Sequence, residues 1–524
     1  MSGRLFYLFF WDTICLMMPQ NYIKAGSHND LEGRDRLLYR ALEILPGFLS
    51  WGTLSAVIFF SWALPSAVAI FIIVFDVYWL IKTFYLSLHL RANWKRLKHN
   101  LEIDWLERLQ NLKWDHVWQL VILPMYKEDY EVVAESLDAL SSARWPKERM
   151  IVVLASEKRA KTTSLTCVEK IEKNYSGKFG KFLVTWHPAG LEGEIPGKGS
   201  NTNWAARVVK EKIIDAERIP YEDILVSSFD IDTQVYQQYF LCLTYNFLTS
   251  EKPHRVSYQP VPLFNNNVWS SPALSRVVAT SGTFWQMMQQ ERPERLSTFS
   301  SHSMSFKMLA DVGFWQKNIV SEDSRIFWNG VLYYDGDYRV IPLSYPVSMD
   351  ANVGRNFWQT ARQVYKQQRR WTWGVENVPY LLFGFTKNKK IKFAKKVRFA
   401  LTQLEGFWGL ATNPILIFLL GWLPLLIGGD EFNAMLLSYN LPRITRVLMT
   451  LAMLGLITSA IISTSLLPPR PKKIGKSRAL AMILQWLLIP VTIIVFGAIP
   501  GLESQARLAL GYPLGFWVTP KHRK

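Results

Sequence analysis

The chain has 524 residues, enough for more than one domain, and a formal net charge of +18. Hydrophobic residues make up 49% of it, and the excess is concentrated in a few long runs. Because the basic residues lie beside those runs, the charge indicates contact with an anionic membrane face and leaves little room for nucleic acid. Cys15, Cys167 and Cys242 are too far apart for a disulfide framework or a cysteine metal pair, which favours a reducing compartment.

The chain begins with an apolar run at residues 5–18 that is interrupted by Asp12 and has no small-residue cleavage site. These features favour an interfacial or membrane-leaning segment over a cleaved signal. We therefore expect residues 1–46 to form a cytoplasmic or interfacial segment.

Five apolar runs are long enough to span a bilayer as helices. They cover residues 47–64, 66–88, 407–428, 445–467 and 479–500. The first two are separated only by Leu64-Pro65-Ser66, which predicts a tight helical hairpin. We expect two transmembrane helices within 47–90, three within 407–500, and a C-terminal tail at 501–524.

Basic residues at the ends of these runs predict the orientation, because cytoplasmic loops are enriched in Lys and Arg. Four groups fall on one side if all five runs cross: Arg34, Arg36 and Arg40; Arg91, Lys95, Arg96 and Lys98; Lys387, Lys389, Lys390, Lys392, Lys395, Lys396 and Arg398; and Arg470, Lys472, Lys473, Lys476 and Arg478. This predicts a multi-pass protein of the inner (plasma) membrane, with a cytoplasmic domain at 91–380 and a basic interfacial segment at 381–406.

The C-terminus disagrees with this pattern. Five crossings place it outside, although it ends in Lys521-His522-Arg523-Lys524. We expect five crossings, and the alternative is a hairpin over 479–516 that is broken near Pro500 and Gly501.

The central domain alternates between short apolar runs and segments with helical spacing, which predicts an α/β sheet with mostly parallel strands. The expected strands are 117–123, 150–155, 181–186, 224–229, 255–264 and 338–343. The expected helices are 129–141, 200–218, 234–249 and a short one at 324–328. Neither a Gly-rich dinucleotide fingerprint nor a P-loop is present.

Residues that follow the expected strands should gather at one edge, where ligands of such sheets bind. They are Pro124, Tyr126 and Glu128 after the first strand, Glu157 after the second, and Asp230 and Asp232 after the fourth. Asp230 and Asp232 could hold a hard divalent cation such as Mg²⁺ or Mn²⁺. A second pair, Asp335 and Asp337, lies in an expected turn and serves as an internal control.

Three further motifs each have a functional and a structural interpretation. Glu322 and Asp323 either cap a short helix or supply a general base. Gln367, Arg370 and Trp371 either belong to an amphipathic helix on the membrane or meet a diphosphate and a sugar ring. Lys198 either approaches phosphate at a helix N-terminus or is a solvated loop residue. His302 is ambiguous, and a packed or surface role is the simpler one.

Taken together, these motifs resemble family-2 glycosyltransferases of the membrane-embedded type, which include cellulose, hyaluronan and poly-N-acetylglucosamine synthases. The similarity runs from about Val117 to Trp371 and rests on the order of the aspartates before the Gln-x-x-Arg-Trp motif. It implies a GT-A nucleotide-sugar fold inserted between transmembrane helices, and an inverting, metal-assisted transfer.

The resemblance also implies roles for individual residues. Asp323 would be the catalytic base, and Asp230 and Asp232 would bind the metal, with Asp230 also meeting the donor. The other residues would line the donor and acceptor sites: Pro124, Tyr126, Glu128, Glu157, Lys198, Glu322, Gln367, Arg370 and Trp371. Glu157 departs from the family, which usually has Asp at that position, so the nucleotide base stays open.

The leading hypothesis is a polysaccharide or oligosaccharide synthase that uses a nucleotide-sugar, with UDP as the expected nucleotide. Transfer of a single sugar to a lipid-linked acceptor is the first alternative. A non-enzymatic membrane scaffold or transporter that senses a nucleotide is the second, with Asp76 and Lys82 within the second run as its support. Membrane lipids are expected partners in each case, and the oligomeric state stays open.

Overall fold

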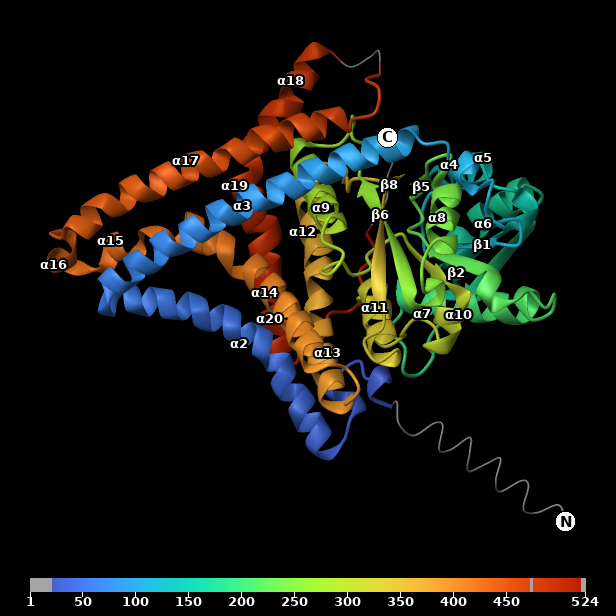
Figure 1. The fold of residues 1–524 in the computed structure, drawn as a ribbon, viewed down its shortest axis with the longest axis horizontal. Coiled ribbons are helices and arrows are strands. Elements are labelled where there is room, and N and C mark those ends of the chain that lie inside the picture. Colours follow the sequence, from blue (N-terminus) through green and yellow to red (C-terminus); the bar gives the residue numbers. More distant parts are fainter. Residues whose placement is uncertain (1–20, 472–474, 520–524) are drawn as a thin grey trace.

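The computed structural model describes residues 21–471 and 475–519. The apolar run at 5–18 lies outside these residues. An α/β domain occupies one end of the molecule, and a set of long helices extends from it (Figure 1). The expected α/β domain between two sets of apolar helices is thereby confirmed.

The domain is built on a mixed, eight-stranded sheet with the strand order β3-β2-β1-β4-β7-β6-β8-β5. Pairings are parallel from β3 to β4 and between β6 and β8, whereas β7 runs antiparallel to both β4 and β6. β5 adds antiparallel to β8. The strands are β1 Trp118–Met125, β2 Met150–Glu157, β3 Lys181–His187, β4 Ile224–Ser228, β5 Gln234–Val235, β6 Val256–Leu263, β7 His302–Ser305 and β8 Arg339–Ser348.

Ten α-helices accompany the sheet, and several differ from the expected ranges. They are α4 Trp105–Leu109, α5 Tyr130–Ser142, α6 Lys161–Tyr175, α7 Lys198–Val209, α8 Tyr239–Leu248, α9 Ala273–Gln290, α10 Phe306–Asp311, α11 Glu322–Tyr333, α12 Phe357–Thr372 and α13 Asn377–Lys387. Two expectations need correction: the helix expected at 324–328 is the longer α11, and the segment 234–249 begins with strand β5 before α8.

Alternate residues of the parallel strands face two hydrophobic cores, as a period of two requires. In β1, Leu120 and Ile122 join the core that includes α7, α11 and α13. Val121 and Leu123 join the opposite core, which includes α5, α6 and α8. Because both faces of the sheet are covered, the carboxyl ends of its strands are the edge left for polar side chains.

The apolar helices are α2 Gly33–Ala63, α3 Pro65–Glu102, α14 Phe393–Phe418, α15 Leu423–Ile427, α16 Gly429–Asn433, α17 Leu436–Ser465, α18 Lys476–Leu484, α19 Ile489–Ile493 and α20 Ile499–Leu510. Among the described residues, four segments are long and apolar enough to cross a membrane, or five if α14 and α15, bent by 47°, form one span. α2 and α3 meet at Leu64, which confirms the tight hairpin.

The last apolar stretch packs on helices of the α/β domain. Its segments contact α9 and α12, and α20 also lies along α2. Tyr365 and Arg369 of α12 bind Glu503 of α20 at 2.8 and 2.6 Å. One helical run, Leu480–Leu510, includes Pro500 and Gly501, so the alternative hairpin does not break there. The number of crossings, the domain limits and the side of the C-terminus stay predictions.

Candidate active site

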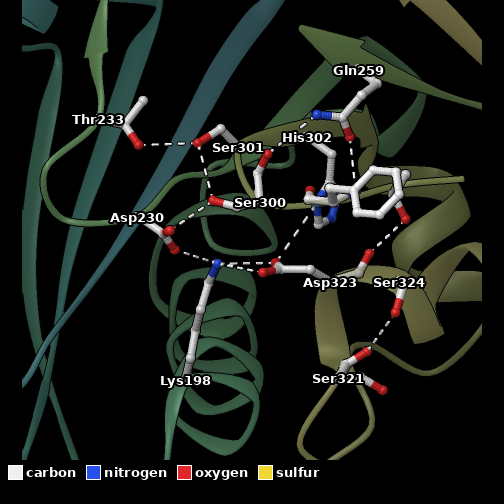
Figure 2. A network of polar contacts seen from close by, with 12 residues as sticks. Lys198, Asp230, Thr233, Gln259, Ser300, Ser301, His302, Ser321, Asp323 and Ser324 are labelled. Carbon is white, nitrogen blue, oxygen red and sulfur yellow. Dashed lines mark hydrogen bonds and ion pairs between the residues drawn. The ribbon is translucent and has the colours of Figure 1, made fainter. Parts of the chain in front are cut away.

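A buried lysine joins two of the expected site carboxylates. Lys198 is the first residue of α7, and its ammonium Nζ lies 2.6 Å from Asp230 Oδ1 and 2.8 Å from Asp323 Oδ2 (Figure 2). Asp230 follows β4, and Asp323 lies in the first turn of α11. Three distant segments therefore converge on one charge, and burial makes the pairing stronger than it would be at the surface.

Asp230 and Asp323 have further partners that fix their orientation. Ser300 Oγ donates to Asp230 Oδ2 at 2.7 Å, and Thr298 Oγ1 donates to the backbone carbonyl of Asp323 at 2.5 Å. His302 Nδ1 lies 3.8 Å from Asp323 Oδ1 and 2.7 Å from the carbonyl of Phe299. Since a carbonyl only accepts, His302 carries its proton on Nδ1.

Burial lowers the pKa of His302, so the ring is neutral near pH 7. The neutral ring places its Nδ1–H near Asp323 and adds no second positive charge beside Lys198. The structure thus brings the ambiguous His302 into the site as a buried neighbour of Asp323.

Asp232, two residues after Asp230, is fully buried. Its Oδ2 accepts the backbone N–H of Asp350 at 2.9 Å, and Asn266 Nδ2 bridges its carbonyl to Asp350 Oδ1 at 3.0 Å each. The oxygen-only donor chemistry of Asp230 and Asp232 fits Mg²⁺ or Mn²⁺. Lys198 engages Asp230, and no group of three metal-ligating side chains occurs within residues 21–471 and 475–519.

Glu322 is a buried carboxyl beside Asp323. It is 2% exposed, and neither of its carboxylate oxygens has a hydrogen-bond partner among the described residues. Burial and the neighbouring charge of Asp323 raise the pKa of Glu322 to about 8. Two adjacent carboxyls in one buried site do not both keep their charge, and here Glu322 holds the proton.

The Gln-x-x-Arg-Trp residues lie on α12 at the boundary with the apolar helices. Gln367 is buried, with Oε1 3.5 Å from Asn352 Nδ2, and Trp371 is 40% exposed with its ring 6.2 Å from that of Phe264. A small cavity opens between these residues, lined by Phe264, Ser275, Val278, Ala279, Asp350, Asn352, Val364, Gln367, Gln368 and Trp371. It combines an aromatic face with amide and carboxyl groups.

The described end of the chain reaches this site. The ring of Phe516 lies directly on Gly197, where a Cβ would approach Phe516 Cγ to 2.4 Å. The guanidinium of Arg370 lies 5.1 Å from the centre of the same ring. Sequence reasoning missed Phe516, and the only signal for it was an aromatic pair, Phe516-Trp517, after the last apolar run.

A separate group lies at the ends of β1 and β2. Glu157 is 4% exposed and forms an ion pair with Arg159, whose guanidinium lies 4.4 Å from the centre of the Tyr126 ring. Glu128 Oε2 accepts the backbone N–H of Tyr126 at 2.7 Å, and Pro124 precedes that turn at the end of β1. Arg159 was not expected, although its place two residues after a strand-end carboxylate is a usable signal.

The expected residues thus form three groups along one edge. Lys198 bonds both Asp230 and Asp323, with Glu322 next to Asp323 and Asp232 two residues after Asp230. Arg370 of α12 lies against the ring of Phe516, and that ring lies on Gly197. Asp335 lies in a left-handed turn with φ 51°, as expected of the control pair, and Asp337 pairs with Lys252 at 2.8 Å on the surface.

Comparisons with known proteins gave similarities to solved structures only. No family model and no curated protein matches the chain. The mannosyltransferase PcManGT from Pyrobaculum calidifontis, in complex with GDP-Man and Mn²⁺, has a TM-score of 0.41 and 14% identity, with 75% of this chain and 98% of that chain covered. S. aureus TarS 1–349 has a TM-score of 0.34 and 14% identity, with 67% and 91% covered. Similarity this low transfers no function.

Replacing Lys198 tests the buried ion pairs. Lys198→Met removes the cation and leaves two carboxylates close together, so we expect the free energy of unfolding to fall by about 3 kcal/mol. Lys252→Met is the matched control, because its pair with Asp337 is about half exposed on both sides and should contribute less than about 1 kcal/mol. Thermal unfolding of the purified proteins measures both, and equal shifts would contradict a buried cluster.

Glu322 gives a pH dependence. Because its pKa is raised in the folded chain above the unfolded value of 4.5, the folded state binds this proton more tightly. The free energy of unfolding that this bound proton contributes is fully present below about pH 4.5 and is lost as the pH rises towards about 8. In melts across this range, Glu322→Gln should lose less stability than the wild type. Glu217→Gln, which removes an exposed partner of Lys181, is the control and should show the same dependence of melting temperature on pH as the wild type. If Glu322→Gln also showed the wild-type dependence, a protonated Glu322 would be refuted.

Proposed function

We propose that this chain is a membrane-embedded, inverting glycosyltransferase that takes a sugar from a nucleotide-sugar, with Asp323 as general base. The observation that carries the proposal is the ammonium of Lys198, held between Asp230 and Asp323 at the carboxyl edge of the parallel strands. A cation between two carboxylates at this edge suits a reaction in which a diphosphate leaves and a hydroxyl loses a proton.

The donor diphosphate would lie near Lys198 and Arg370. Fixed cations in a buried site stabilise charge that develops on a leaving group. Asp230 and Asp232 would hold Mg²⁺ or Mn²⁺, and a bound divalent ion supplies further stabilisation of the departing diphosphate. Phe516 covers Gly197 beside Lys198 and would exclude water from this part of the site.

Asp323 would accept the proton of the attacking hydroxyl. The acceptor oxygen forms its bond to the anomeric carbon while the bond from that carbon to the diphosphate oxygen breaks, and the proton passes to the Asp323 carboxylate. Lys198 binds the Asp323 carboxylate before the reaction, and Glu322 holds its own proton beside it, so one base faces the acceptor. Attack from the side opposite the diphosphate inverts the anomeric configuration.

The nucleotide base would lie at the ends of β1 and β2. Tyr126 offers an aromatic face, while Pro124 and Glu128 shape the turn that carries it. The Glu157–Arg159 pair presents a carboxylate beside a guanidinium, which suits the N–H and carbonyl edge of uracil and leaves guanine possible. A UDP-sugar is therefore the proposed donor.

The acceptor would enter along α12, where Gln367 and Trp371 line the small cavity with Phe264. A sugar ring can stack on a half-exposed indole while amides bind its hydroxyls. A growing polysaccharide or oligosaccharide is the proposed acceptor. A lipid-linked acceptor is the second candidate, because α12 packs against α20 and against the π-helical turn Ile494–Ala498 that precedes α20.

The membrane arrangement follows from the helices and the basic groups. Four helices within residues 21–471 and 475–519 are long and apolar enough to span a membrane, and we propose that the α/β domain lies on the cytoplasmic face of the plasma membrane. Donor nucleotide-sugars would then reach the site from the cytoplasm. No observation among the described residues favours a scaffold or transporter over a transferase.

The decisive experiment supplies the purified full chain with Mg²⁺ or Mn²⁺, membrane lipids and a panel of UDP- and GDP-sugars. We expect release of nucleoside diphosphate from at least one donor. Asp323→Asn should lower turnover about 10²- to 10⁴-fold, because proton transfer by a positioned base contributes that much. Nucleotide binding by the variant should be nearly unchanged, which separates the base from a structural role.

Asp337→Asn is the matched control, since this aspartate lies in the surface turn and not at the strand edge. Normal turnover by Asp323→Asn would show that the base is wrongly assigned. Failure of the wild type to consume any sugar nucleotide would refute the transferase. Mass spectrometry of the product then distinguishes a polymer from a single added sugar.

A further inference from the structure

A second charged cluster lies among the apolar helices, away from Lys198 and its aspartates. Lys82 of α3 and Arg295, in the turns after α9, both bind Glu405 of α14. Arg295 Nη1 lies 3.2 Å from Glu405 Oε2, and the Lys82 ammonium bonds the other carboxylate oxygen. Lys82 also lies 4.6 Å from the centre of the Trp79 ring. Two cations thus share one carboxylate.

Arg292 adds a third cation that this carboxylate does not bind. Its side chain is 7% exposed, its guanidinium lies 5.6 Å from the Tyr85 ring centre, and its Nε is buried with no hydrogen-bond partner among the described residues. Burial and the neighbouring Arg295 lower the pKa of Arg292. A buried guanidinium Nε without a hydrogen-bond partner is costly, and a ligand that accepts its hydrogen bond would remove this cost.

The cluster lies beside exposed aromatic and apolar side chains of α3. Tyr78, Lys82 and Tyr85 follow each other along one face of α3, at the spacing of successive helical turns. Tyr78 and Tyr85 are 49% and 44% exposed, and their neighbours Ile81 and Phe84 are exposed apolar residues of a candidate spanning helix. Aromatic residues beside basic ones are typical of the membrane boundary, where lipid headgroups lie.

We propose that Arg292, Arg295 and Lys82 bind the phosphate of a lipid headgroup at this boundary. A guanidinium offers paired N–H donors that match phosphate oxygens, and the aromatic rings of α3 suit the adjoining glycerol or isoprenoid carbons. A bilayer phospholipid and an isoprenoid phosphate share this chemistry. The site does not depend on the transferase reaction, because none of these three side chains bonds Lys198, Asp230 or Asp323 in the described part of the chain.

Arg292→Gln is the sharpest test, because Arg292 takes part in no ion pair and its removal leaves both bonds to Glu405 intact. Native mass spectrometry of the full chain in detergent would measure retention of phosphatidylglycerol, an isoprenoid phosphate and diacylglycerol, with inorganic phosphate as a competitor. We expect both phosphate-bearing lipids, or one of them, to bind, and Arg292→Gln to bind at least tenfold more weakly. Diacylglycerol should not be retained.

Arg96→Gln is the control. Arg96 is also basic and lies on α3, the helix that carries Lys82, but its side chain is 60% exposed and is paired with Glu291. It should bind like the wild type, and Arg292→Lys should recover part of the affinity. Equal retention by wild type and Arg292→Gln, or retention of diacylglycerol at the same level, would overturn the proposal. Inorganic phosphate binding as tightly as the lipids would overturn the lipid assignment. Unchanged thermal unfolding of Arg292→Gln distinguishes lost binding from misfolding.

Discussion

The rest of the site depends on the burial of one ammonium group. Lys198 is 8% exposed, and a charge taken out of water needs close partners of opposite sign. Its partners come from the end of β4 and the start of α11, so the chain between these elements must fold in a way that brings them to α7. Asn201 of α7 donates to the carbonyl of Ala155 in β2 at 2.6 Å, which fixes this helix against the sheet.

Asp323 is held from the opposite side by α13 and the turn before it. Glu376 accepts the backbone N–H groups of Val320 and Ser321 at 3.1 and 2.8 Å, and the Ser321 hydroxyl at 2.6 Å. These bonds order the segment that starts α11. The fully buried Arg325, two residues after Asp323, donates to Asn377 Oδ1 and to the carbonyl of Ala25. The helix with the proposed base is thus tied both to α13 and to the N-terminal segment.

Much of the fold could be predicted, because the spacing of apolar residues and the position of polar residues after a strand can both be read from a short stretch of sequence. The main parallel strands, the α2–α3 hairpin and the strand-edge location of Asp230 follow from apolar runs and their neighbours. Strand β7 could not be predicted, because its sequence, from His302 to Ser305, is polar and is buried only by its partners β4 and β6. Such a strand carries no alternation that the sequence alone could show.

The site was harder to predict than the fold for a related reason. The contacts of Phe516 with Gly197 and Arg370 join segments that lie hundreds of residues apart, and no local pattern encodes such a meeting. The protonated state of Glu322 is likewise set by burial and by Asp323, not by its neighbours in sequence alone. The sequence did indicate which residue types would form the site and the order in which they occur along the chain.

The same geometry sets a condition on how a donor could bind. Asp230 Oδ1 faces Lys198 and Oδ2 accepts from Ser300, so both oxygens are already engaged. Asp230 would therefore hold a divalent ion only by sharing or giving up one of these bonds, and Lys198, if released from Asp230, would be available to an incoming diphosphate. Because Lys198 also holds Asp323, any shift towards the donor would loosen the proposed base at the same moment. Under the proposed function, donor binding would therefore also release Asp323 from Lys198, and the base would stay paired until a substrate is present.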